Sequence, residues 1–185
     1  MADVTARNIV GQALPILLLC VLIEVGAGLV LGGMEENFKL LPGLIVLVPP
    51  LLGLRGNISG ALASRLGTAL HQGVLDPRFL WGPEMRVNVF SSFFLTLLVS
   101  ASAGILAWLV TLLVGIESVS LFTFLAIAII AGILSSFILI GLTIGIAFMS
   151  YAKGFDPDNV TSPLMASIGD IFTIICIYIS VLLVA

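Results

Sequence analysis

The chain has 185 residues, of which 60% are hydrophobic and only 9% are charged, with a formal net charge of −3. A soluble domain carries roughly 25% charged residues, so this composition excludes an ordinary soluble protein and indicates a membrane protein. Cys20 and Cys176 both fall in apolar runs, where we expect small packing residues rather than a disulfide.

Apolar runs separated by polar breaks predict a bundle of five membrane-spanning helices. The runs lack the alternation of a membrane β-barrel, and no linker is long enough to separate two domains. We therefore predict one all-α transmembrane domain over residues 1–185. Its spans are expected at about residues 9–31, 40–70, 87–114, 121–151 and 160–185.

Basic residues near the span ends predict a cytoplasmic N-terminus and an external C-terminus, in a multi-pass protein of the cell membrane. The larger share of them falls on the side of the N-terminus and of the loops at 71–86 and 152–159. That side carries Arg7, Arg65, Arg78, Arg86 and Lys153, and the other carries Lys39 with Glu35, Glu36 and Glu117.

The second span contains Pro49 and Pro50. Two adjacent prolines remove two backbone donors, so we expect them to kink or break the helix where it is buried in protein or lines water. Small residues follow at helical spacing, and they either let another backbone approach closely or leave room for a hydrated solute. These residues are Gly53, Gly56, Gly60, Ser64 and Gly67.

The fifth span carries Asp170, about 15 Å along the helix from the polar loop that contains Asp156 and Asp158. An ionisable group at that depth is costly, and it marks a functional site or a structural hydrogen bond to a neighbouring helix. We expect a first helical turn at Pro163, a polar path with Asp170 at its constriction, and an acidic entrance at Asp156 and Asp158. Residues that share the Asp170 face include Pro163, Ala166, Ser167 and Thr173.

Glu24 is the only other acid well inside an expected span. It could form a pair with Arg55 or line a cavity, and a structural role is as well supported as a transport role. Because the candidate ligands are oxygens with no histidine or cysteine among them, zinc and copper are poor substrates for this site.

Two segments resemble the membrane domain of the MgtE magnesium transporter family, and most of all its eukaryotic solute-carrier relatives. They are PPLLGLRGNISGALASRLGTA (49–69) and DPDNVTSPLMASIGD (156–170), which share the family's proline and aspartate spacing and its Gly-Asn pair. The resemblance implies a homodimer in the lipid bilayer with an ion path near the two-fold axis, between the second and fifth helices. Asp170 would be the central ligand of Mg²⁺, with Ala166 and Ser167 beside it and Gly56, Asn57 and Gly60 along the path.

Two features depart from the family's pattern. Arg55 stands where the family has a small residue, and only eight residues precede the first expected span. We therefore expect no attached magnesium sensor and allow for a separate regulatory subunit. Small-residue stripes at Gly56/Gly60 and Gly141/Gly145 are the expected dimer interface.

Two other function classes stay open. An intramembrane aspartyl protease would need Glu24 as the second acid, and Ser167-Ile168-Gly169-Asp170 lacks the first glycine of the GxGD motif of that class. A non-conducting membrane scaffold would use Asp170 only as a structural contact. The sequence has no phosphate loop, hydrolase motif or basic patch, so we expect no enzyme activity, no organic cofactor and no nucleic-acid partner. The sequence does not decide between a passive channel and a Na⁺- or H⁺-coupled exchanger.

Overall fold

The computed structural model describes the backbone of residues 6–34, 41–75, 81–155 and 157–184. Within these ranges, every regular element is helical. The elements are α1 (Ala6–Gly33), the 3₁₀ turn η1 (Leu44–Leu47), α3 (Val48–His71), α4 (Pro83–Val114), α5 (Leu121–Ala152) and α6 (Pro157–Val184). Five of the helical segments are long and apolar enough to cross a membrane. The prediction of an all-α multi-pass protein is confirmed, and the orientation of the termini stays a prediction.

The second span is not broken by its two prolines, so that prediction was wrong. Leu44–Leu47 forms a 3₁₀ turn that leads directly into α3, and Pro49 and Pro50 lie in the first turn of that helix. The N–H groups of a first helical turn have no acceptor within the helix, so proline costs little there. Gly43 enters the 3₁₀ turn at a φ of 80°, a conformation that favours glycine.

The fifth span begins at Val160, as predicted, but its helix begins three residues earlier. Helix α6 starts at Pro157, and Pro163, which we expected in the first turn, lies inside the helix. Pro157 suits a helix start because its missing N–H has no partner there in any case. Asp170 then has 13 residues before it and 14 after it in this 28-residue helix, which places it at mid-span. Asp156 and the side chain of Asp158 lie outside the described residues, so the acidic entrance stays a prediction.

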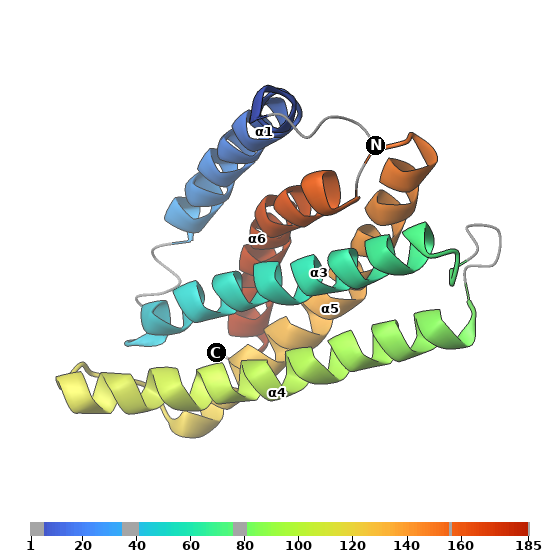
Figure 1. The fold of residues 1–185 in the computed structure, drawn as a ribbon. Helices are drawn as coiled ribbons and strands as arrows, with labels where there is room; N and C mark the ends of the chain where they lie inside the picture. The colour runs from blue at the N-terminus through green and yellow to red at the C-terminus, as the bar shows by residue number, and fades with distance from the viewer. Residues whose placement is uncertain (1–5, 35–40, 76–80, 156, 185) are drawn as a thin grey trace.

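Helix α6 is the element around which the others pack. It contacts α1, α3 and α5, while α4 packs against α3 and α5. Figure 1 shows α6 between α1 and the α3–α5 side of the bundle. Because α1 is held mainly through α6, most of its apolar side chains stay exposed, with Leu22 at 70% and Leu29 at 74%. In a bilayer such a surface faces lipid or another protein.

Small residues allow α3 and α6 to approach closely. A Cβ built on Gly56 would lie 3.5 Å from the Ala166 Cβ, and one built on Gly60 would lie 2.9 Å from the Ser162 Oγ. The Gly56/Gly60 stripe, expected at a dimer interface, is therefore occupied within the chain by α6. Gly141 and Gly145 have open space around them.

Both cysteines are buried and free, as predicted. Cys176 belongs to the main apolar core, which gathers side chains from η1, α3, α4, α5 and α6. Its role there is packing, since a thiol behaves as a small apolar group when buried.

Candidate ion site between α1 and α6

Asp170 faces Glu24 across the contact between α6 and α1. The two carboxyl groups are close enough to share a side-chain hydrogen bond. Asp170 is half-buried and Glu24 is exposed in the single chain. Glu24 lies near the middle of the Ala13–Gly33 span, so both acids sit at mid-membrane depth.

Two ionised carboxyl groups this close would repel each other, and a positive ion or a proton between them relieves that repulsion. A hydrogen bond between them requires one shared proton, because an ionised carboxylate only accepts. A cation that replaces the proton would meet the same oxygens. The pair can therefore hold either a proton or a positive ion.

The α6 residues predicted to share the Asp170 face differ in how deeply they are buried. Ser167 and Thr173 are buried, whereas Pro163 and Ala166 are half-buried. Thr173 Oγ1 is buried without a hydrogen-bond partner among the described residues. Buried hydroxyls are rarely left unpaired, so this oxygen is a free acceptor and donor on the Asp170 helix.

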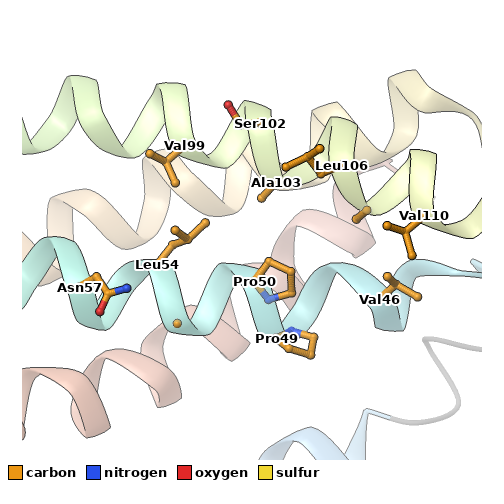
Figure 2. Close-up of a pocket in the computed structure, with 12 residues that line it drawn as sticks. Val46, Pro49, Pro50, Leu54, Asn57, Val99, Ser102, Ala103, Leu106 and Val110 are labelled. Carbon is orange, nitrogen blue, oxygen red and sulfur yellow. The ribbon is translucent and has the colours of Figure 1, made fainter.

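The predicted α3 residues divide between two faces of the helix. Gly56 and Gly60 lie against α6, on the side where the path was expected. Asn57 instead lines a cavity of about 510 Å³ between α3 and α4, together with Pro49, Pro50 and Ser102. Figure 2 shows Asn57 on α3 next to Leu54, at the end of the cavity away from Pro49 and Pro50. The single chain therefore does not bring Asn57 and Asp170 into one cavity.

Arg55 points into the bundle and away from the acids. It is 3% exposed. Its guanidinium donates to Ser100 Oγ of α4 at 2.8 Å and to Ser136 Oγ of α5 at 3.2 Å. The sequence left open a pair between Glu24 and Arg55, but the guanidinium of Arg55 bonds to the two serines and to neither acid. Arg55 instead links α3 to α4 and α5.

The described residues of one chain offer Mg²⁺ only part of a ligand set. Within them, no group of three or more His, Cys, Asp and Glu side chains could hold a metal ion. The Glu24–Asp170 pair supplies two carboxyl groups. Mg²⁺ usually keeps several waters and takes one or two carboxylates, so the pair fits a mostly hydrated ion.

Five spans, with one acid on α1 and one on α6 near mid-span, define a multi-pass membrane protein with ionisable groups at membrane depth. The chain belongs to the MgtE family, described as divalent cation transporter, whose profile matches residues 48–180. The family resemblance seen in the sequence is confirmed. Glu24 lies outside the matched range, on α1.

Relatives with curated names are solute carriers. The chain is 32% identical to solute carrier family 41 member 3 of Rattus norvegicus over 88% of its length, and 34% identical to member 2 of Xenopus laevis over 92%. Human member 2 is 34% identical over 81% of the chain. The chain spans about a third of these relatives, from 27% to 36% of their length. No solved structure matches the chain.

Proposed function

We propose that this protein moves Mg²⁺ across a membrane, as a transporter or channel. Membership of the divalent cation transporter family supports the transport class. In this chain, the proposal is supported by the neighbouring carboxyl groups of Glu24 and Asp170 at mid-membrane depth. Two acids at mid-membrane depth, with no basic partner among the described residues, are costly unless a positive ion or proton lies between them.

Asp170 is the proposed central ligand, and it acts through the waters of a hydrated ion. Mg²⁺ releases its waters reluctantly, so a polar lining that binds those waters suits it better than a dehydrating cage. Ser167 and Thr173 supply hydroxyls on the same helix, and Ala166 supplies a carbonyl. The Thr173 hydroxyl, one turn from Asp170, has no hydrogen-bond partner among the described residues and could accept a water of the hydrated ion.

The proposed working unit is a homodimer with the path near its two-fold axis. One chain offers two carboxyl groups, and a second copy would add another Asp170 to the same hydrated ion. The exposed faces of α1 and the open surface at Gly141 and Gly145 are the candidate contacts, since Gly56 and Gly60 are already covered by α6. Chemical crosslinking in native membranes should give a single dimer band, and a monomer that transports would contradict the homodimer.

The acid pair is also what an intramembrane aspartyl protease would need. Two facing carboxyl groups could activate a water, so the contact between Glu24 and Asp170 favours this second candidate more than the sequence did. The family match and the absence of the first glycine of GxGD both favour transport. Cleavage of a membrane-embedded peptide by the purified protein would overturn the transport proposal.

The test is magnesium flux into proteoliposomes made with the purified full chain. Vesicles that contain a Mg²⁺-sensitive dye should report uptake well above that of protein-free vesicles. Uptake that needs an imposed Na⁺ or proton gradient would identify a coupled exchanger, and uptake without either would identify a channel. No flux under any of these gradients would favour the scaffold.

Replacing Glu24 with glutamine is expected to weaken the ion site without unfolding the protein. The glutamine amide can still bond to Asp170, but one of the two negative charges is gone. We expect the Mg²⁺ concentration for half-maximal flux to rise by about tenfold, which is the effect of ~1.4 kcal/mol in ion binding. Dose–response curves in proteoliposomes measure this shift.

Glu117→Gln is the matched control, because Glu117 is exposed in the loop after α4. It should leave the half-maximal concentration unchanged. If Glu24→Gln behaves like this control, Glu24 is not part of the ion site.

A further inference from the structure

An open cavity of about 360 Å³ lies where the end of α3 meets the first turns of α4. It is separate from the acid pair and from the α3–α4 cavity around Asn57. Figure 1 shows the C-terminal end of α3 beside the start of α4. Five of its seven lining residues carry hydrogen-bonding side chains, although apolar atoms contribute most of the lining surface; the five are Ser64, Arg65, Thr68, Gln72 and Asn88.

The cavity offers donors and one positive charge. Arg65 donates to Ser92 Oγ at 3.0 Å, which uses only one of the five N–H groups of a guanidinium. Asn88 Nδ2 donates to the Glu84 carbonyl oxygen at 3.0 Å, which orients its amide at the rim. No described lining residue is acidic. Such a cavity suits a compact anion with several acceptor oxygens.

The depth of the cavity matches that of a lipid headgroup. Arg65 lies six residues before the end of α3 at His71, about 9 Å along the helix, and Gln72 and Val74 line the outer end. A long arginine side chain at that depth extends toward the membrane interface. Trp81, 52% exposed, lies just before α4, where an aromatic side chain is typical of the interface.

Apolar surface continues from the cavity along α4. Leu95 is 42% exposed and lies two turns beyond Asn88 on the same face of α4, and Leu98, one turn further along, is 67% exposed. Acyl chains could lie along these residues while a headgroup occupies the cavity. A free anion would gain nothing from this surface, so the surroundings favour a lipid.

We propose that this cavity binds the phosphate group of an anionic phospholipid, with Arg65 as the charged contact and Thr68 and Gln72 as further donors. Arg65, which the sequence interprets as a topology residue, then holds lipid at the α3–α4 end. The proposal does not depend on which ion the protein moves.

Native mass spectrometry of the purified full chain tests this proposal. Phosphatidylglycerol and phosphatidylcholine with identical acyl chains serve as probes. We expect the wild type to retain phosphatidylglycerol about tenfold better, since one basic residue near a membrane surface already contributes a several-fold preference. Arg65→Gln should reduce the preference to near onefold. Equal retention of the two lipids by the wild type would overturn the proposal.

Arg86→Gln is the matched control, because Arg86 is exposed on the first turn of α4 and does not line the cavity. If Arg86→Gln loses as much of the phosphatidylglycerol preference as Arg65→Gln does, the preference comes from general surface charge, and the proposed lipid site is wrong. Inorganic phosphate should not displace the lipid, and displacement would assign the cavity to a free anion instead. If Arg65→Gln does not fold, Gln72→Glu serves in its place, because Gln72 is exposed and the added charge would repel a phosphate.

Discussion

Asp170→Asn is expected to remove most magnesium flux while the protein stays folded. The asparagine side chain has nearly the shape of aspartate, and its amide can donate to the Glu24 carboxylate that Asp170 faces. Because Arg55 bonds to Ser100 and Ser136, the change leaves no buried cation without its partner. The thermal transition in detergent should therefore stay close to that of the wild type.

The size of the loss follows from the charge. A divalent ion and one carboxylate about 5 Å apart, at an effective dielectric constant of about 20, attract each other by roughly 7 kcal/mol. Even a fifth of that attraction corresponds to about tenfold in ion binding. We therefore expect flux at low magnesium concentration to fall by at least about tenfold in proteoliposomes.

Asp170→Ala separates the ion role from a structural role. It removes the hydrogen bond as well as the charge, so a purely structural Asp170 would leave the asparagine variant active and make only the alanine variant unstable. If Asp170 holds the ion, both variants lose flux. A stable Asp170→Asn protein that transports magnesium at the wild-type rate would contradict the proposed site.

The sequence predicts the number and approximate limits of the spans because hydropathy over some twenty residues is a strong local signal. It misplaces two helix starts for one shared reason. A proline pair inside an apolar run looks like a break, yet Pro49 and Pro50 lie in the first turn of α3 after a 3₁₀ turn. In the same way, Pro157 rather than Pro163 starts α6. Proline signals a boundary without saying on which side the helix lies.

The site was predicted only in part, because sequence does not reveal which helices are neighbours. The sequence indicated Asp170 because of its depth in the membrane span. It also indicated Glu24, but not that Glu24 contacts Asp170. The contact between them depends on α1 packing against α6, which no local pattern encodes. The arginine contacts did leave a signal, since Ser92, Thr96 and Ser100 recur every four residues and are all buried on one face of α4, where Ser92 accepts from Arg65 and Ser100 from Arg55.

Gly132→Leu is expected to disrupt the centre of the bundle, where Arg55 joins α3 to α4 and α5. A Cβ at Gly132 would lie 2.7 Å from Ser100 Oγ and 3.0 Å from Arg55 Nη2. A larger side chain must displace the guanidinium from its hydroxyl acceptors, which leaves a buried charge poorly satisfied. Overpacking and the stranded charge together should lower the free energy of unfolding by about 3–5 kcal/mol.

Gly141→Leu is the matched control on the same helix, since nothing lies within 4 Å of a Cβ at Gly141. Both changes gain the same helix propensity, so a thermal shift assay on the monomer fraction in detergent, where Gly141 meets no second chain, compares only their surroundings within one chain. The double variant Arg55→Ala/Gly132→Leu should recover much of the loss, because the leucine then enters the space that the guanidinium leaves. If Gly132→Leu is as stable as Gly141→Leu, or if removing Arg55 brings no recovery, the arginine–serine contact does not organise this part of the bundle.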